Sequence, residues 1–330
     1  GTGNNLLSSH FGMDSFGAKL MAQVVTDAAK AHRDSVCSTV WSTDGSAIAT
    51  ASEDKTIKVW DPHSGVLRNT RTFSVISNAQ EVAWSTTEGS NFVACESKAV
   101  QIFDCRGKQT AHKIVTPSPN LHVSWKPDGK YVAVTDSDDR ISIIDTRTLR
   151  ILKENKYDFK VNEVGWNPFS ESDVFFMSTY KGRSHGGGTV DTMDFNEKGI
   201  LKLIRSINGH AGECCCIDFS QVGDKFAIGS FDSIVSIWDL EHLVCTANLM
   251  SLNERVKSVS FSHDGKHIAA ASTASEPIQV CSVTTGEMVG QIACPTTTRS
   301  IAWSRKQHAF AFAFDTNSGP KSSTLRLVTV

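Results

Sequence analysis

Long apolar runs are missing from this sequence. The longest are short stretches such as "KFAIG" at 225–229 and "HIAAAS" at 267–272, far below the roughly 18 residues of a membrane-spanning helix. Neither charge sign is in marked excess, because 33 basic and 35 acidic residues give a formal net charge of −2. The first 30 residues show no signal-peptide pattern. We therefore expect no membrane partner and no general electrostatic attraction to nucleic acid.

Catalytic motifs are also missing. The sequence contains no Walker A pattern and no H-E-x-x-H. The stretch "SHGGG" at 184–188 resembles the oxyanion-hole glycines of some lipases, but a mobile loop between two blades is the better interpretation. We expect no catalytic residues, no cofactor and no metal, so the chain is predicted not to be an enzyme.

A disulfide framework is not indicated either. The nine cysteines are an odd number spread over 330 residues. Several of them, including Cys37, Cys95 and Cys281, lie within alternating apolar stretches, and no Asn-x-Ser/Thr sequon occurs. This pattern is typical of reduced, buried thiols in an intracellular protein.

A repeat of about 42 residues runs through the chain. An aromatic residue followed by turn-forming residues recurs at intervals of 43, 41, 41, 53, 42 and 42 residues. The single long interval contains the glycine-rich insertion. The seven aromatic positions are Trp41, Trp84, Trp125, Trp166, Phe219, Phe261 and Trp303.

Each unit contains short apolar runs separated by turns, such as "YVAVTD" and "RISIID", and their period-2 alternation predicts β-strands with one apolar face. Seven units of four strands predict an all-β, seven-bladed β-propeller. The last unit is one strand short, so residues 19–26 are expected to supply it and close the ring. We expect residues 1–18 to be a flexible segment, residues 19–330 to form one propeller, and residues 181–189 to form a mobile loop.

The segment 208–239 resembles a WD repeat. It contains the Gly209-His210 pair and the closing Trp238-Asp239, and the first unit resembles it in turn. The chain is therefore similar to WD-repeat β-propellers, in which a His, a Ser, an Asp and a Trp form a buried hydrogen-bond chain between strands. The resemblance implies two such structural tetrads: His32, Ser52, Asp54 and Trp60; and His210, Ser230, Asp232 and Trp238.

Within that family, stretches such as "KVNEVGWN" and "GSFDSIVSIWDLEHLVC" resemble the WD-repeat subunits of THO complexes. The match is good from about 118 to 315 and poor at 62–117. It implies a nuclear scaffold that binds the other protein subunits of a THO/TREX-type complex, in mRNA packaging, processing and export, and touches RNA only indirectly. The propeller itself is expected to be monomeric.

Three consecutive cysteines, Cys214, Cys215 and Cys216, follow His210. They fall in the first strand of the fifth unit, where alternation would put Cys214 and Cys216 on one face and Cys215 on the other. A site of His210, Cys214 and Cys216 lacks a fourth ligand at any usual zinc spacing. Buried apolar packing is the better interpretation.

A candidate binding surface follows from the fold expected. In WD-repeat proteins, side chains about four residues before the aromatic mark line the top mouth of the central channel. Lys257 and Arg299 would then lie side by side near Arg255, as a small basic spot for a carboxylate-bearing peptide or a phosphate; an ordinary solvated rim is the alternative. The mouth positions are Cys37, Gln80, Leu121, Asn162, Cys215, Lys257 and Arg299, and the candidate partner-binding residues are Gln80, Asn162, Arg255, Lys257 and Arg299.

Three functions remain open at the level of sequence. The first is the interaction scaffold. The second is a reader that binds a modified peptide or RNA at the channel mouth, which an aromatic cage would favour, although none of the seven mouth positions is aromatic. The third, a hydrolase, lacks nucleophile and acid/base groups.

Overall fold

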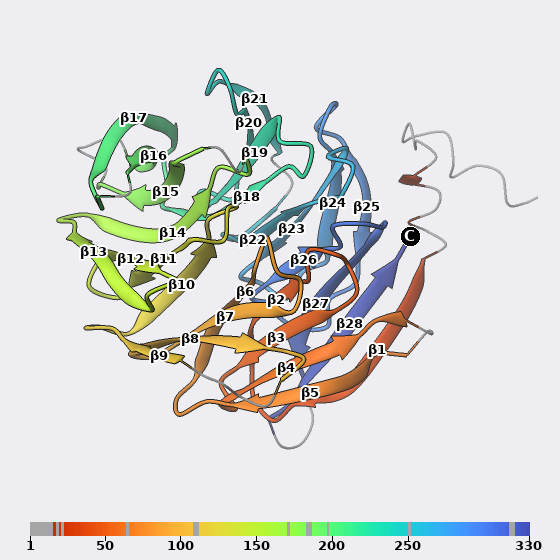
Figure 1. Ribbon diagram of the computed structural model, residues 1–330. Helices are drawn as coiled ribbons and strands as arrows, with labels where there is room; N and C mark the ends of the chain where they lie inside the picture. The colour runs from red at the N-terminus through yellow and green to blue at the C-terminus, as the bar shows by residue number, and fades with distance from the viewer. Residues whose placement is uncertain are drawn as a thin grey trace, which may run out of the picture.

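The computed structural model describes residues 16–17, 20, 23–63, 66–107, 112–169, 172–182, 187–196, 198–249, 252–316 and 321–330. These residues form seven four-stranded antiparallel sheets, which stand as blades in a ring (Figure 1). The prediction of an all-β, seven-bladed propeller is confirmed. No helix among the described residues is long and apolar enough to cross a membrane.

The first strand of each blade is innermost, and the first strands of successive blades contact one another around the channel. We call the face of the ring at which these innermost strands begin the top face. The innermost strands are β2 (Val36–Trp41), β6 (Ala79–Trp84), β10 (Asn120–Trp125), β14 (Lys160–Trp166), β18 (Cys214–Phe219), β22 (Val256–Phe261) and β26 (Ile301–Trp303).

The remaining strands follow outward in chain order. The second strands are β3 (Ile48–Ser52), β7 (Asn91–Glu96), β11 (Tyr131–Asp136), β15 (Val174–Tyr180), β19 (Lys225–Ser230), β23 (His267–Ser272) and β27 (Ala309–Asp315). The third strands are β4 (Thr56–Asp61), β8 (Ala99–Asp104), β12 (Arg140–Asp145), β16 (Gly188–Phe195), β20 (Val235–Asp239), β24 (Ile278–Ser282) and β28 (Ser323–Thr329). The outermost strands are β5 (Arg68–Ser74), β9 (His112–Val115), β13 (Arg150–Lys156), β17 (Leu201–His210), β21 (Cys245–Leu249), β25 (Met288–Ile292) and β1 (Val24–His32).

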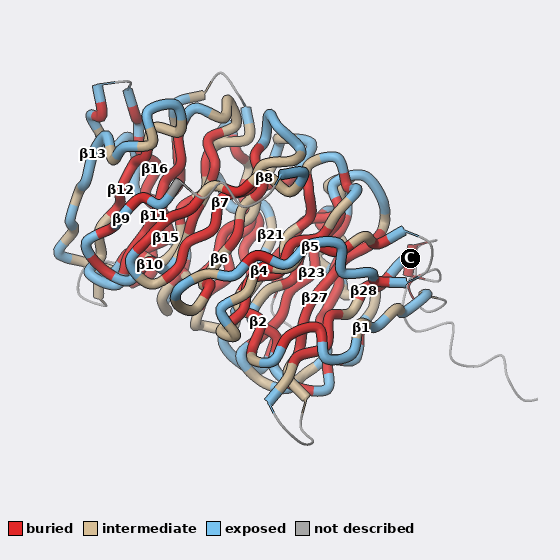
Figure 2. Tube along the Cα trace, turned by 60° about the horizontal axis from the view of Figure 1, so that its bottom comes forward, coloured by how far each residue is buried: buried red, intermediate tan, exposed pale blue. Residues whose placement is uncertain are grey.

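The core lies between the blades. At each of the seven junctions of adjacent blades, residues of both blades form one apolar cluster. Every residue of β3, β11 and β23 is buried, whereas the outer strands are largely exposed (Figure 2). The sequence predicted strands with one apolar face, but a blade packed between two neighbours must bury both faces of its central strands.

The ring is closed by an N-terminal strand, as predicted, since β1 pairs antiparallel with β28 (Figure 1). This strand begins at Val24 and ends at His32, so the predicted range of 19–26 covers only its start. A bidentate ion pair fixes the register, because Arg326 donates from Nε and Nη2 to the two carboxylate oxygens of Asp27, each at 2.7 Å. Such fork-shaped pairs are the most geometrically specific ion pairs.

Residues before β1 also pack on the propeller. The ring of Phe16 stacks on His267 with centroids 3.7 Å apart, and Leu20 lies so close to Gly290 that a Cβ there would be 2.3 Å from Leu20 Cδ2. Both side chains belong to the cluster between blades six and seven. The expectation of a flexible segment 1–18 is therefore wrong for Phe16, while residues 1–15 and 18 lie outside the described residues.

The glycine-rich insertion is partly described. Residues 183–186 of the predicted mobile loop lie outside the described residues. Gly188 begins β16, and a Cβ at this position would lie 2.0 Å from the carbonyl oxygen of Gly212. The expectation of mobility is therefore wrong for Gly188, whose missing side chain lets blade four approach the first residues of blade five.

Candidate interaction surface

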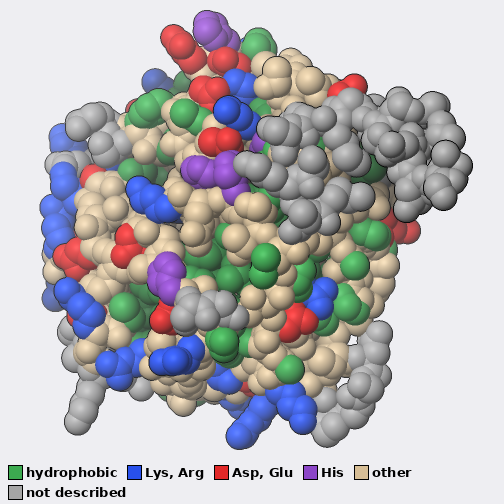
Figure 3. All heavy atoms as spheres, turned by 90° about the vertical axis from the view of Figure 1, so that its right-hand side faces the viewer, with side chains coloured by type: hydrophobic (Ala, Val, Ile, Leu, Met, Phe, Trp, Pro, Cys, Tyr) green, Lys and Arg blue, Asp and Glu red, His purple; other side chains and the backbone are tan. Residues whose placement is uncertain are grey.

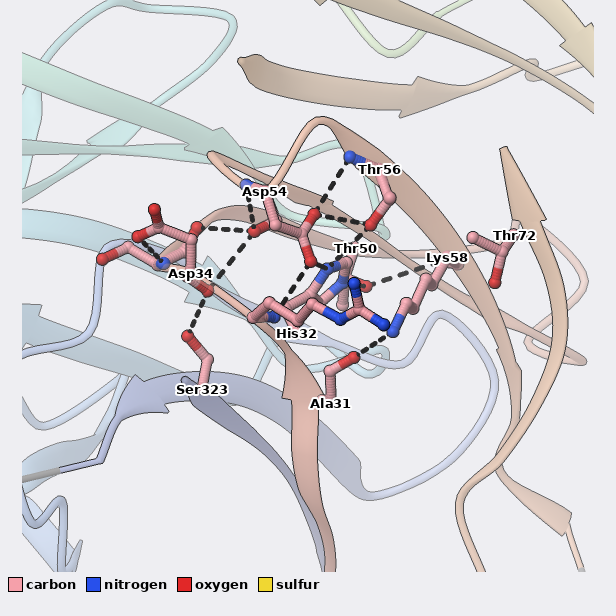
Figure 4. A network of polar contacts seen from close by, with 12 residues as sticks. Ala31, His32, Asp34, Thr50, Asp54, Thr56, Lys58, Thr72 and Ser323 are labelled. Atoms are coloured by element: carbon pink, nitrogen blue, oxygen red, sulfur yellow. Dashed lines mark hydrogen bonds and ion pairs between the residues drawn. The ribbon is translucent and has the colours of Figure 1, made fainter. Parts of the chain in front are cut away.

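The first tetrad joins two blades at the point where the ring closes (Figure 4). Trp60 Nε1 donates to Thr50 Oγ1 at 2.9 Å, and Thr50 Oγ1 lies 2.7 Å from His32 Nε2. An indole nitrogen only donates, so the Thr50 hydroxyl donates to His32 Nε2, and His32 Nδ1–H donates to Asp54 at 3.0 Å. Ser52, expected within this chain, instead donates to the carbonyl oxygen of Ser35 at 2.9 Å.

The second tetrad has the same order of hydrogen bonds, but its bridging hydroxyl comes from the third strand of the blade, β20, rather than from the second. Trp238 Nε1 donates to Ser236 Oγ at 2.7 Å, and Ser236 Oγ lies 2.7 Å from His210 Nε2. His210 Nδ1 reaches Asp232 at 3.1 Å. The expected Ser230 is again outside the chain and accepts from the backbone N–H of Asp232 at 3.2 Å. In both tetrads the predicted His, Asp and Trp meet, but the bridging hydroxyl is not the predicted one.

The tetrads are structural. Burial lowers the pKa of His32, which keeps the ring neutral in its contact with Asp54. Burial raises the pKa of Asp232, but hydrogen bonds from His210 and from backbone N–H groups outweigh it and hold the pKa at about 2. His32 ends β1 and His210 ends β17, the outermost strands of the preceding blades. Each tetrad therefore fastens the outer strand of one blade to the next blade.

The innermost strands carry a repeated irregularity near the top face. In six of them the pairing with the second strand slips by one residue, so that one extra residue is accommodated in the inner strand. A bulge of this kind releases a side chain from the pleat and turns it aside. The residues at the slips are Cys37, Gln80, Leu121, Asn162, Cys215 and Lys257, six of the seven predicted mouth positions.

All seven predicted mouth positions line one cavity of about 490 Å³ at the channel mouth. Lys257 and Leu121 are exposed, while Gln80 is half-buried. Asn162 is engaged structurally, because its side-chain amide donates to the carbonyl oxygen of Cys214 at 2.7 Å. The seven positions thus lie together, and Lys257 and Arg299 lie on the same face.

The predicted basic spot is smaller than expected. Arg299 donates to Glu53 Oε1 at 2.7 Å, and Lys321 lies 3.3 Å from the other oxygen of the same carboxylate. Arg299 is therefore part of an ion-paired group across the junction of blades seven and one. The cation at the mouth that keeps its charge exposed is Lys257, with Arg255 beside it in sequence.

An aromatic side chain at the mouth escaped the sequence analysis. Phe231 lines the cavity, and the guanidinium of Arg255 lies 4.7 Å from the centre of its ring. Such stacking holds an arginine in place while leaving its hydrogen-bond donors available. Phe231 follows Ser230 in the turn after β19, a region the inner-strand rule does not cover. Lys160 and Glu213, which form a 2.6 Å ion pair on the cavity wall, were missed because each lies six residues before an aromatic mark and the rule selects the residue four before it.

One residue further along the inner strands, three half-buried ionisable residues from blades two, three and four meet. His122 Nε2 lies 3.1 Å from a carboxylate oxygen of Glu81 and 3.1 Å from one of Glu163. Burial alone would lower the pKa of His122, but the two carboxylates outweigh it and raise the pKa to about 10. The imidazolium is thus a fixed cation that joins three blades. The sequence signal for this cluster is the residue three before each aromatic mark.

The three consecutive cysteines are packing residues, but not as alternation predicted. The pairing slips between Cys214 and Cys216, so Cys214 joins the cluster between blades four and five, and Cys216 joins that between blades five and six. The expectation that these two share a face is wrong. Cys215 lies at the mouth, where its thiol donates to the carbonyl oxygen of Val256 at 2.8 Å. All nine cysteines are free thiols.

Comparison with known proteins agrees with this geometry. The family described as WD domain, G-beta repeat matches residues 24–61 and 201–239, the two segments that hold the tetrads. THO complex subunit 3 of Arabidopsis thaliana is 31% identical over 298 residues, which cover 89% of this chain and 90% of the relative. WD repeat-containing protein AAC3 of Dictyostelium discoideum is 26% identical, and the alignment spans about half of its length, 51%.

Among solved structures, the β-propeller domain of Cps50 (Swd1) from Myceliophteria thermophila superposes with a TM-score of 0.77. It covers 93% of this chain at 15% identity, which supports the fold alone. The relationship to the plant protein is closer and spans nearly both chains. The chain therefore belongs to the THO complex subunit 3 family of WD-repeat β-propellers.

Proposed function

We propose that this protein is a non-catalytic interaction scaffold of a THO/TREX-type complex, in which it supports mRNA packaging, processing and export in the nucleus. The observation that carries the proposal is the 31% identity to THO complex subunit 3 over nearly the whole of both chains. Its partners are the other protein subunits of that complex, and it contacts RNA only through them.

The arrangement of polar groups supports a scaffold. Both tetrads are used to fasten blades, and the cluster around His122, which lines the same cavity as the mouth residues, holds its charges in contacts that join three blades. Basic and acidic side chains are interspersed on the side of the molecule shown in Figure 3. Proteins that read RNA directly usually present a continuous basic surface with aromatic side chains for stacking.

The partner surface we propose is the top face around the channel mouth. Of the five predicted contact residues, Lys257 and Arg255 offer exposed charges, Gln80 offers an adaptable amide, and Asn162 and Arg299 are held by contacts within the ring. An acidic segment of a partner subunit would pair with Lys257 and Arg255. Exposed cations at a rim mainly set orientation and association rate, so their reversal weakens a complex without unfolding the chain.

The test is a gentle purification of the tagged chain from nuclear extract after nuclease treatment, read by mass spectrometry. We expect recovery of the other THO subunits with the unaltered chain and reduced recovery with the Arg255→Glu/Lys257→Glu variant. Lys266→Glu is the matched control, because Lys266 is an exposed lysine of the same blade in the turn at the opposite face. Absence of THO subunits with the unaltered chain contradicts the scaffold; equal recovery with all three chains contradicts only the proposed surface.

A second candidate is a reader that binds a modified peptide or RNA at the mouth. The observation that favours it is the stacked pair of Phe231 and Arg255 beside Lys257, which together offer an aromatic face and two cations. Fluorescence anisotropy with a phosphopeptide or a short RNA tests it. Saturable binding that Phe231→Ala abolishes supports the reader, and no binding at physiological salt rules it out.

A further inference from the structure

Two turns on the face opposite the channel mouth bring together three metal-ligating side chains. His263 and Asp264 lie in the turn between β22 and β23 of blade six, and His308 lies in the turn between β26 and β27 of blade seven. One ligand atom from each residue lies within 4.8 Å of the others, and all three residues are half-buried. This is the one group of three or more such residues found in the described part of the chain.

Each side chain has a ligand atom to offer. Asp264 Oδ1 already accepts from Ser262 Oγ at 2.7 Å and from the backbone N–H of Lys266 at 3.2 Å, which fixes the carboxylate and leaves Oδ2 facing His308 Nε2 at 3.9 Å. The rings of His263 and His308 lie 4.3 Å apart, nearly perpendicular. His263 Nδ1 is buried and has no hydrogen-bond partner among the described residues.

The turn itself does not require His263. In blade one, "STDG" at 42–45 forms the same turn, in which Asp44 Oδ1 accepts from Ser42 Oγ at 2.6 Å and from the backbone N–H of Ser46 at 3.0 Å. Thr43 stands where blade six has His263. The aspartate is therefore explained by turn geometry, whereas His263 beside it is not.

We propose that His263, Asp264 and His308 bind a divalent transition metal ion of the Zn²⁺ class. Imidazole nitrogen with one carboxylate is a donor set that Zn²⁺ prefers, and three protein ligands leave one position for water. Zn–N and Zn–O bonds of about 2.0–2.2 Å place tetrahedral ligand atoms about 3.4 Å apart, so the side chains need to move inward by about 1 Å. The ring of Phe16, 5.3 Å from that of His308, covers one side of the group.

The ion would tie blade six to blade seven. These blades share the apolar cluster that holds Phe16 and Leu20, and blade seven is the one that β1 completes. A ligand that binds only the folded chain raises its stability by mass action. The site thus gives the closing region of the ring a second fastening, which depends on metal availability and on neutral histidines.

The test uses the full chain, purified without a histidine tag and treated with chelator, and ZnCl₂ alone as the probe in calorimetry. We expect one ion per chain and a higher melting temperature with Zn²⁺. His263→Thr, which recreates the turn of blade one, and His308→Gln are each expected to weaken binding at least tenfold. His242→Gln is the control, since His242 forms a 2.9 Å pair with Asp239 in a turn outside this cluster.

Two further measurements, Co²⁺ absorption and the pH dependence of binding, test the proposed metal site. Substitution with Co²⁺ is expected to give the strong visible absorption of a four-coordinate site in the unaltered chain, and to lose it in His263→Thr. Binding is expected to weaken at acidic pH, because protons compete with the metal ion for the imidazole nitrogens. The proposal is overturned if the unaltered chain binds no Zn²⁺ saturably, or if binding survives unchanged in both histidine variants.

Discussion

Trp41 Nε1 donates a hydrogen bond of 2.9 Å to the carbonyl oxygen of Ala302, from which it is separated by 261 residues. The same bond recurs in blades three and four: Trp125 donates to the carbonyl oxygen of Ala83, and Trp166 to that of Ser124. The aromatic residue that marks the repeat is thus a clamp between neighbouring inner strands as well as a core side chain. Where the last blade meets the first, this clamp spans the closure of the ring.

Comparing variants of two tryptophans measures how much the hydrogen bond of Trp41 contributes to the free energy of unfolding. Trp41→Phe loses both ring volume and the hydrogen bond, whereas Trp84→Phe loses only ring volume, because Trp84 Nε1 has no partner among the described residues. We expect Trp41→Phe to lower the free energy of unfolding by about 1–2 kcal/mol more than Trp84→Phe. Urea denaturation of both variants measures the difference, and equal losses would show that the bond contributes nothing.

The hydrogen bonds of the first tetrad predict that loss of the Thr50 hydroxyl lowers the free energy of unfolding more than loss of the Ser52 hydroxyl. Thr50→Val keeps the side-chain shape but leaves Trp60 Nε1 and His32 Nε2 without their partner, at an expected cost of about 2–4 kcal/mol. Ser52→Ala mainly removes a partner of the Asp54 backbone N–H, because the Ser35 carbonyl oxygen still accepts from Glu53, and about 1 kcal/mol is expected. If thermal unfolding shows a larger loss of stability for Ser52→Ala than for Thr50→Val, the hydrogen-bond chain through Ser52 that the sequence predicted would be supported instead.

The His122 cluster makes stability depend on pH in a defined direction. The folded pKa of about 10 lies above the unfolded value near 6.5, so the stabilisation is complete below pH 6.5 and is lost as the pH rises toward 10. We expect stability to fall between pH 6 and 9 more steeply in the unaltered chain than in His122→Gln. Buried thiols lose stability in the same direction, and the difference between the two chains removes their effect.

The matched control for this pH series is His242→Gln. The hydrogen bond to Asp239 raises the pKa of His242, but this ion pair is exposed to solvent, where such pairs contribute little to stability. We expect its stability curve to run parallel to that of the unaltered chain. Urea midpoints at each pH give both curves, and a steeper curve for His122→Gln would contradict the assignment of the charge.

Graded truncation tests the role of the residues before blade one. Removing residues 1–22 takes away Phe16 and Leu20 but leaves β1, and a lower melting temperature with a monomeric, folded chain is expected. Removing residues 1–30 takes most of β1 and exposes β28 as an edge, so aggregation is expected. Chromatography with light scattering separates the two outcomes, and a monomeric chain with unchanged melting after the longer truncation would show that β1 is dispensable.

The repeat predicted most of the fold because it records the parts of a blade that packing constrains. Seven aromatic marks located the innermost strands, and the missing strand of the last unit predicted closure by the N-terminal segment. The residue four before each mark was a sound guide to the channel mouth, since the bulge occurs at the same place in six blades. Spacing along a repeat carries over from blade to blade, so these positions could be read from the chain.

Contacts between blades could not be predicted from the spacing of residues along the repeat. The ion pair of Arg299 with Glu53 joins residues from opposite ends of the chain, and nothing in either local sequence indicates it. Thr50 and Ser52 are both small hydroxyl residues on β3, and only the pairing with His32 and Trp60 distinguishes them. The slip at Cys214 likewise depends on the pairing of β18 with β19, since alternation alone assigns the opposite face.

Closure by β1 has a consequence for how the chain is made. A ribosome releases β1 first and β28 last, and the paired residues Asp27 and Arg326 are 299 positions apart. At about 5–20 residues per second, β1 waits on the order of 15–60 s for its partner strand. Throughout synthesis the strand presents unpaired backbone groups, together with side chains such as Val24 and Val25 that are exposed even in the finished ring. The nascent chain is therefore a substrate for chaperones until β28 emerges, and a ribosome that stalls within the seventh blade leaves an open ring with two unpaired strand edges.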